Sequence, residues 1–265
     1  MQDIAVEAAR FIAAHACEPI VLADVADHVG YSPFYLARSF ERHLGVTPGQ
    51  FLAAHRFQWA KRLLLSGDER VIDVCFAVGF TSVGTFTTRF AAAVGSSPTE
   101  FRRLPHLLAD SPPRPVVIPG AARRGGVVTG TAYLSPAASA ALGGAASVYV
   151  GLFPRRSARG FPVSGSLLSQ TGDFVLTDVP PGTYWVLASA LPTRADIQTQ
   201  LVPARSVLGS STRPVRIAPD NLLHYRDVHL DVAEGWSAPV LVALPPLASA
   251  CSQDWRRREQ ARVLG

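Results

Sequence analysis

One eight-residue stretch returns later in the chain with the same turn chemistry. The first copy reads Asp24-Val25-Ala26-Asp27-His28-Val29-Gly30-Tyr31, and forty-nine residues later the second reads Asp73-Val74-Cys75-Phe76-Ala77-Val78-Gly79-Phe80. Beyond the glycine and the aromatic residue after it, the correspondence continues at an offset of fifty, in the pairs Ser32/Ser82, Leu36/Phe86, Phe40/Phe90, Gly45/Gly95, Pro48/Pro98 and Phe51/Phe101. One supersecondary unit per period of this length indicates a duplicated module.

Each copy predicts two helices joined by a tight turn. Apolar residues recur at helical spacing before each glycine, as at Leu22, Val25 and Val29. Gly30 and Gly79 supply the positive φ that ends one helix and turns the chain. The hydroxyl and proline residues that can start the following helix are Ser32, Pro33, Thr81 and Ser82. Such a pair is the DNA-binding helix-turn-helix, whose second helix enters the major groove. The alternative is a plain helical hairpin bundle, which the duplication and the polar or small outer face of each second helix disfavour.

Three segments carry a family resemblance: Gly30-Tyr31-Ser32-Pro33-Phe34-Tyr35-Leu36-Ala37-Arg38-Ser39-Phe40, Arg56-Phe57-Gln58-Trp59-Ala60-Lys61-Arg62-Leu63-Leu64, and Val78-Gly79-Phe80 through Ser97-Pro98-Thr99-Glu100-Phe101-Arg102. They resemble the AraC/XylS family of bacterial transcription regulators, over roughly residues 1 to 104. The resemblance implies seven helices, with two helix-turn-helix units held by a rigid linker helix at about Thr47 to Leu65. Both recognition helices would then lie on one face and read two major-groove segments about one turn, roughly 34 Å, apart.

The resemblance also implies which side chains reach DNA. The implied positions are Phe34, Ala37 and Arg38 in the first recognition helix and Val83, Gly84, Thr85, Thr87 and Thr88 in the second. Arg38 is the candidate for a bidentate guanine contact, because its fork matches O6 and N7. The second helix departs from the family pattern, since Val83, Gly84 and Thr88 stand where relatives often carry Gln or Arg. This departure weakens base reading by the second unit. Arg56 and Lys61 in the linker helix are interpreted as positional, with a structural ion pair expected for Arg56.

Charge is distributed unevenly along the chain. Residues 1–105 hold ten basic and ten acidic residues, so the net charge of +5 comes from the other half. Phosphate neutralisation supplies most of the affinity for DNA, so a basic domain would be the simple expectation. The acids cluster on or before the first helix of each unit, at Asp24, Asp27, Asp68, Glu69 and Asp73. We therefore expect a local basic face with an acidic back and a modest affinity.

The remaining composition fits a two-domain protein of the bacterial cytoplasm. A length of 265 residues and an apolar content of 48% suffice for two cores. Cys17, Cys75 and Cys251 lack metal or disulfide spacing, and free thiols are typical of a reducing compartment. No signal peptide or membrane-length apolar run is evident. The sequence predicts no cofactor and no membrane association.

The chain changes character between about Pro105 and Gly126, where proline and glycine predict an extended linker. Short alternating runs follow at the spacing of an antiparallel sandwich. These predicted strands are 127–132, 147–153, 173–176, 183–188 and 225–232.

A second resemblance lies in Gly126/Gly130, in Val148 to Leu152 and in Thr171-Gly172-Asp173-Phe174-Val175-Leu176-Thr177-Asp178-Val179-Pro180-Pro181-Gly182-Thr183-Tyr184-Trp185-Val186. These residues resemble a carboxypeptidase-regulatory-like, prealbumin-type β-sandwich, which implies a structural or binding unit rather than a catalyst. The stretch from Pro192 to Pro219 is a long insertion relative to that pattern. It is expected either to shape a pocket or to be a flexible excursion. Arg155-Arg156-Ser157-Ala158-Arg159 makes a basic loop.

Other constellations favour no enzyme. Ser164, Ser166, His224, Asp227 and His229 supply the residue types of a hydrolytic triad, but no Gly-x-Ser-x-Gly elbow positions a nucleophile. The two histidines are five residues apart, which does not place them on one strand face as metal ligands. The basic tail at Trp255-Arg256-Arg257-Arg258 reads as a solvated helix end rather than a nucleic-acid contact.

The sequence as a whole predicts an all-α double helix-turn-helix domain followed by an antiparallel β-sandwich domain. The expected boundaries are 1–104 for the DNA-binding domain, 105–126 for the linker, 127–235 for a sandwich that senses or assembles, and 236–265 for a tail. The expected function is sequence-specific transcription regulation on double-stranded promoter DNA, with RNA polymerase and a small-molecule effector as further partners to consider. The alternative is a carbohydrate- or peptide-binding sandwich protein whose helical domain does not bind DNA.

Overall fold

The computed structural model describes residues 2–110, 113–122, 125–193, 195–203, 205–219 and 221–247. The chain divides into two compact units. The helical unit comprises the described residues up to Thr99 together with Arg155–Phe161 and Ala233–Val242. The sheet unit comprises Glu100–Pro154, Pro162–Val232 and the described residues from Ala243 onward. Cys251 and the basic tail 255–258 lie outside the described residues.

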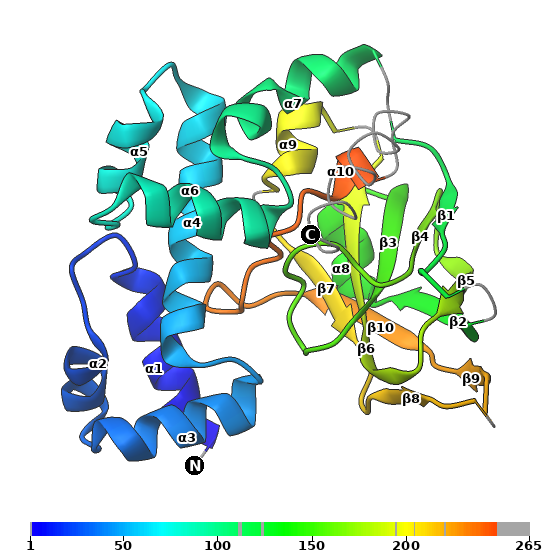
Figure 1. Cartoon of the computed structure of the whole chain (residues 1–265), viewed down its shortest axis with the longest axis horizontal. Coiled ribbons are helices and arrows are strands. Elements are labelled where there is room, and N and C mark those ends of the chain that lie inside the picture. The colour runs from blue at the N-terminus through cyan, green and yellow to red at the C-terminus, as the bar shows by residue number, and fades with distance from the viewer. Residues whose placement is uncertain are drawn as a thin grey trace. The chain divides into compact units, whose positions relative to one another are not determined.

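Seven helices occupy residues 2–110, the number that the sequence predicts for this region. Their bounds are α1 Gln2–Ala14, α2 Leu22–Val29, α3 Pro33–Leu44, α4 Pro48–Ser66, α5 Val71–Ala77, α6 Val83–Val94 and α7 Pro98–Asp110. The predicted linker helix is α4, which runs between the α2–α3 and α5–α6 hairpins (Figure 1).

The turns of the two hairpins form as their sequences predict. Gly30 and Gly79 adopt φ values of +72° and +80°, a left-handed conformation that side chains with a Cβ rarely take. The hydroxyl oxygens of Ser32 and Ser82 each accept a hydrogen bond of 3.3 Å from the main-chain N–H three residues on. Each second helix thus starts at a serine cap. The repeat in the sequence is a repeat in the structure.

Aromatic side chains fill the core of each hairpin. Phe40 and Phe51 meet edge to face with ring centroids 5.3 Å apart, beside buried residues of α1 and α2. In the second hairpin Phe57 of α4 contacts the rings of Phe80 and Phe90, with centroids 5.2 and 5.7 Å away. Burying each such ring contributes about 1.5–3 kcal/mol, so these rings fix both hairpins to α4.

The rest of the chain is rich in strands. Their bounds are β1 Val116–Ile118, β2 Gly126–Leu134, β3 Ala146–Phe153, β4 Gly165–Leu168, β5 Gly172–Val179, β6 Gly182–Pro192, β7 Val207–Ser210, β8 Val215–Ile217, β9 Leu223–Tyr225 and β10 Val228–Val232. Three short helices accompany them, namely α8 Pro136–Leu142, α9 Ile197–Leu201 and α10 Leu244–Leu247.

These strands form one hydrogen-bonded sheet in the order β1-β4-β3-β6-β7-β10-β2-β5, with β8 paired to β6 and β9 paired to β2. Most neighbours are antiparallel, but β2 pairs in parallel with both β10 and β9. Strand β5, at one end of the order, also contacts β1 and β4 at the other end, so the sheet curls into a half-barrel. A β-rich domain after the helices is therefore confirmed, while its identity as a β-sandwich stays a prediction.

Two stretches of the second half differ from their sequence-based interpretation. The predicted insertion between Pro192 and Pro219 contains β7, which lies between β6 and β10 and so completes the sheet. The predicted last strand is divided into β9 and β10, because Arg226 and Asp227 bond to the main chain of β2 between them. Strand pairing is decided by distant residues, which local alternation does not reveal.

The stretch between Pro105 and Gly126 holds more regular structure than an extended linker. Helix α7 continues through Pro105 to Asp110. Strand β1 follows and pairs with β4, with Val117 opposite Ser166. The domain boundaries given above remain predictions.

Candidate DNA interface

The outward side of α3 is aromatic and basic. Leu36 and Phe40 are fully buried, whereas Phe34 is 72% exposed and Arg38 is exposed. Phe34 and Arg38 are four residues apart and therefore neighbours on the helix surface. The Cζ atom of Arg38 lies 5.7 Å from the centre of the Phe34 ring, within cation–π range. This contact orients the guanidinium fork on the exposed side of the first hairpin's second helix.

The outward side of α6 is small and polar. Phe86 and Phe90 are fully buried, while Gly84, Thr85 and Thr88 are exposed. A Cβ added at Gly84 would meet nothing within 4 Å, so the backbone there is open to a partner. This side offers hydroxyl and main-chain groups and few long side chains that could read bases.

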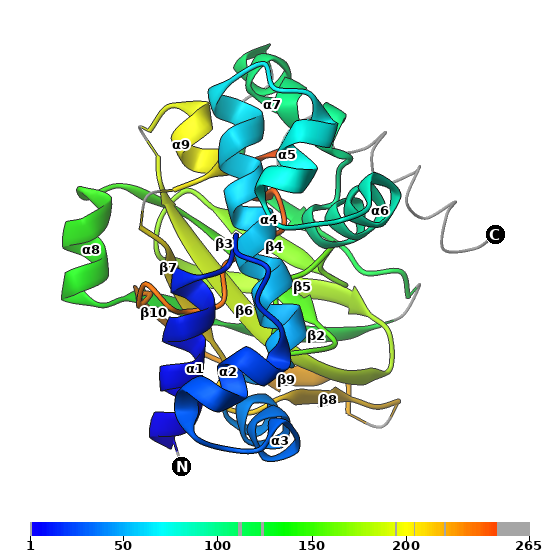
Figure 2. The ribbon, with the colours of Figure 1, turned by 90° about the vertical axis from the view of Figure 1, so that its left-hand side faces the viewer.

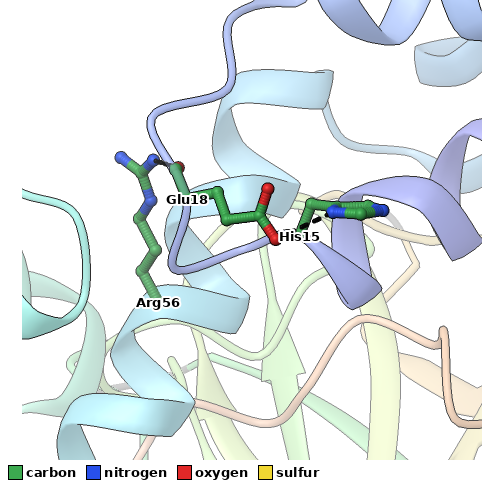
Figure 3. A network of polar contacts seen from close by, with 3 residues as sticks. All are labelled: His15, Glu18 and Arg56. Carbon is green, nitrogen blue, oxygen red and sulfur yellow. Dashed lines mark hydrogen bonds and ion pairs between the residues drawn. The ribbon is translucent and has the colours of Figure 1, made fainter.

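Arg56 of α4 ties the two hairpins together. Its Nε donates to the main-chain oxygen of Ala16 and its Nη2 to that of Glu18, both at 2.8 Å. The Glu18 side chain meanwhile bonds to His15 at 2.9 Å, as Figure 3 shows. Burial lowers the pKa of Arg56. Its structural role agrees with expectation, but its partners are carbonyl oxygens rather than the acid of an ion pair.

The same guanidinium also packs against the turn of the second hairpin. Its Cζ lies 5.8 Å from the centre of the Phe80 ring. A Cβ added at Gly79 would lie 3.0 Å from that Cζ, so only glycine suits the turn. Arg56 thus contacts the segment after α1 and the turn between α5 and α6 at once, which sets the two hairpins relative to each other.

Lys61 lies further along α4 and is 2% exposed. Burial, and to a smaller extent the nearby charge of Arg62, lower its pKa to about 7. A lysine in this place acts inside the helical unit and does not face a ligand, so its interpretation as positional agrees with its burial.

The acidic residues support the first helix of each hairpin. Asp24 accepts a hydrogen bond of 2.7 Å from the main-chain N–H of Val21, at the start of α2. Asp73 bonds Arg70 at the start of α5, at 2.9 and 3.1 Å, and that contact lowers the pKa of the Asp73 carboxyl. Both carboxylates lie on α2 and α5, and not on the exposed sides of α3 and α6. Asp24 and Asp73 therefore lie away from the exposed sides of α3 and α6, while Glu41 is an exposed acidic residue of α3.

The residues that are predicted to contact DNA differ in how exposed they are. The exposed ones are Phe34, Arg38, Gly84, Thr85 and Thr88. The half-buried ones are Ala37, Val83 and Thr87. All eight lie on α3 or α6, and α4 runs between these two helices (Figure 2). Their contact with DNA remains a prediction.

Two aromatic residues of this surface were not among the predicted positions. Tyr31 and Tyr35 are 44% and 38% exposed, and their rings stack with centroids 5.1 Å apart. They flank the Ser32 cap, next to Phe34. The sequence offered only a weak signal for them, because Phe80 stands directly after the turn glycine of the second copy and is buried.

The alternative catalytic residues have structural partners. The Ser164 hydroxyl is buried and donates to the Ile118 oxygen at 2.9 Å. His224 bonds the main-chain oxygen of Asn221, and Asp227 accepts from the main-chain N–H of Thr131. Throughout the described ranges no group of three or more His, Cys, Asp or Glu residues could hold a metal ion. Among the same residues no helix combines the length and apolarity needed to span a membrane.

Comparison with known families identifies the helices. A family described as the helix-turn-helix domain matches residues 25–104, which include both hairpins and α4. Residues 25–104 are therefore a helix-turn-helix domain. Its two hairpins are the copies that the internal repeat marks.

Curated relatives match in the same region. The melibiose operon regulatory protein of Escherichia coli (strain K12) is 32% identical over 94 residues, or 36% of this chain and 31% of that protein. The probable thc operon regulatory protein of Rhodococcus erythropolis is 36% identical over 96 residues, or 35% of this chain and 29% of that protein. This chain spans about a third of the length of these curated relatives.

Solved structures match the helix-turn-helix region as well. The DNA-binding domain of AdpA, a global transcriptional factor solved in complex with a target DNA, is 27% identical with a TM-score of 0.37. That match covers 39% of this chain and 93% of the AdpA domain.

Proposed function

We propose that this protein is a sequence-specific DNA-binding transcription regulator. The observation that carries the proposal is the pair of capped helix-turn-helix hairpins on α4, each with the outward side of its second helix exposed. Two such helices suit adjacent major-groove segments about one turn, roughly 34 Å, apart on one face of the duplex.

The two recognition helices have different roles in this proposal. Arg38 of α3 reads a guanine through its bidentate fork, with Phe34 and Ala37 beside it. The small and polar residues of α6 grip the backbone or touch thymine methyl groups, through Thr85, Thr87 and Thr88 around Val83 and Gly84. Base contacts specify and phosphate contacts position, so most of the sequence information would come from the first hairpin.

The β-rich domain adjusts promoter occupancy in this proposal. It would act by shifting a population of conformations, as a sensor of a small effector or as an assembly surface, and not by chemistry. RNA polymerase is the further protein partner at a promoter. The resemblance of its core hairpin to prealbumin-type β-sandwiches supports a binding role, and we assign the protein no catalytic activity and no cofactor.

Selection from random DNA with the full chain tests the proposal. Duplexes retained by the protein at about 0.1 M salt are sequenced over successive rounds. The expected result is a motif with one sharp half and one weak half, centred about 10 base pairs apart. A pool that stays random, with no salt-dependent retention, would show that the helical domain does not bind DNA and would favour a carbohydrate- or peptide-binding protein.

A further inference from the structure

A short loop from the second half of the chain belongs to the helical unit. Arg155–Phe161 connects β3 to β4, and both of these strands are in the sheet unit. The main-chain N–H of Gly160 donates a hydrogen bond of 2.8 Å to the oxygen of Ala93, in the last turn of α6. Gly160 has φ +66°, and a Cβ there would lie 3.0 Å from the oxygen of Ala92. The loop is therefore held closely against the C-terminal end of the second recognition helix.

The same loop also meets the end of the first recognition helix. Gly45 ends α3 in a left-handed conformation with φ +73°. A Cβ added at Gly45 would lie 3.4 Å from the Cβ of Arg156, which is van der Waals contact. The basic loop, as we call residues 155–161, thus joins the C-terminal ends of α3 and α6.

All the charged side chains of the basic loop are positive. Arg155, Arg156 and Arg159 are three of its seven residues, and none of the seven is acidic. Burial lowers the pKa of Arg159, and the charges of Arg89 and Arg155 lower it further. Because Arg89 lies on α6, the loop extends a cluster of guanidinium groups from the recognition helix itself.

This charge compensates for the composition of the helices. Residues 1–99 contain eight basic and nine acidic residues, so these helices bring no positive excess to a polyanion. DNA affinity depends largely on the number of phosphates that Lys and Arg neutralise. The three arginines of the basic loop add positive charge to the helical unit, whose residues 1–99 have no net positive charge.

We propose that the basic loop contacts the phosphate backbone of the DNA duplex between the two major-groove segments that α3 and α6 enter. On one face of a duplex, adjacent major-groove segments are separated by the minor groove and the backbones that border it. A segment that joins the ends of both recognition helices lies over that region, and arginine is well suited to phosphate oxygens. This inference rests on the proposed function.

Salt dependence of binding by the full chain tests this contact. A selected duplex and an unrelated duplex of equal length are titrated by fluorescence anisotropy at several salt concentrations. The combined variant Arg155→Ala, Arg156→Ala, Arg159→Ala is compared with the unchanged chain. We expect the slope of log Kd against log salt to fall by about 2–3, since each phosphate contact contributes about 0.9. Both duplexes should lose affinity by the same factor, on the order of tenfold to a hundredfold at about 0.1 M salt.

Two further variants separate charge from folding. The matched control Arg205→Ala, Arg213→Ala, Arg216→Ala removes three exposed arginines of the sheet unit and should leave the slope unchanged. The single change Arg155→Glu at an exposed position preserves the rest of the loop and should still lower the slope. Lysine at all three loop positions should retain most of the affinity, because an ammonium also neutralises a phosphate.

The outcomes distinguish this inference from the proposed function. If the unchanged chain binds its selected duplex but the alanine and glutamate variants keep its salt slope, the loop does not meet phosphate and only this inference fails. If the control variant lowers the slope equally, the effect is one of overall charge, and the inference again fails. If the unchanged chain binds neither duplex, the proposed function fails and this inference with it.

Discussion

The Nε atom of Arg56, in the middle of α4, donates a hydrogen bond of 2.8 Å to the main-chain oxygen of Ala16, just past the end of α1. The same guanidinium bonds the Glu18 oxygen and lies over the ring of Phe80. One side chain thus donates hydrogen bonds to two carbonyl oxygens of the segment between α1 and α2, and it also packs on a ring of the second hairpin. The spacing of the two recognition helices depends on this contact.

The variant Arg56→Ala should lower the free energy of unfolding by about 1–3 kcal/mol, because two carbonyl oxygens lose a charged donor. Arg56→Lys should restore only part of this, since an ammonium lacks the planar fork. Urea denaturation followed by circular dichroism measures the change. Arg62→Ala is the control, because Arg62 is exposed and its Cζ lies 4.9 Å from the centre of the exposed Trp59 ring. Equal losses in both variants would contradict the role given to Arg56.

Lys61 should make stability depend on pH. Burial lowers its pKa from 10.5 to about 7, so between these values the unfolded chain holds a proton that the folded chain does not. The free energy of unfolding should therefore rise between about pH 7 and pH 10 by roughly 1–3 kcal/mol from this group. Lys61→Met should be more stable at pH 7 and should lack this rise. Denaturation of both proteins at pH 7, 8.5 and 10 gives the difference, and a constant difference would exclude the effect.

Arg38→Ala should cost about 1–3 kcal/mol of specific binding and relax the preference at one base pair. The reason is the loss of a bidentate donor from the exposed side of α3. Repeating the selection from random DNA with the variant measures the preference at every position. Arg62→Ala on α4 serves as the matched control and should leave the motif unchanged. A motif identical to that of the unchanged chain would remove Arg38 from the base-reading residues.

Gly84→Gln should sharpen the weak half of the motif. The added side chain meets no atom within 4 Å of its Cβ, and it places an amide fork on the exposed start of α6. Bidentate bonding to adenine would add about 1–3 kcal/mol of discrimination at one position. Gly49→Gln is a control, since its Cβ is equally unobstructed but lies at the start of α4. An unchanged second half in the Gly84 variant would show that α6 does not face the bases.

Trp236→Ala should loosen the first hairpin. Trp236 comes from the 233–242 stretch of the helical unit and packs on the core cluster that contains Ile12, Leu36 and Phe40. Removing a partly buried indole should cost about 1–3 kcal/mol. Hydrogen–deuterium exchange should show weaker protection in α1 and α3. Trp185→Ala, which alters a half-buried indole in β6 of the sheet unit, should leave α1 and α3 unchanged.

The sequence predicted best what depends on local chemistry. The turn glycines and the serine caps follow from residues within a few positions of one another, and they were found where predicted. The linker helix, which the family resemblance implied, is α4. The partners of Arg56 were not predicted, because Ala16 lies forty residues away and offers only its main chain. β7 was missed for the same reason, since a short strand inside a long insertion is recognised only by its neighbours in the sheet.

The contact residues show a similar division. Family resemblance placed all eight on α3 and α6, while their different exposures emerged only from packing. Val83 and Thr87 are half-buried because the rings of α6 draw that side of the helix inward, which no single position reveals. The assignment of the basic loop to the helical unit depends on contacts between residues about sixty-five positions apart, such as Gly160 with Ala93.

The division of the helical unit over three stretches of chain has a consequence for how the protein is made. A ribosome that has just completed α7 has produced all seven helices, but neither residues 155–161 nor residues 233–242. The last of these stretches is translated only after β10, the final strand of the sheet. A gene fusion that joins the helices to another protein and ends after α7 would lack Trp236 and the three arginines of the basic loop. A fusion that keeps the codons up to residue 242 retains all three stretches of the helical unit.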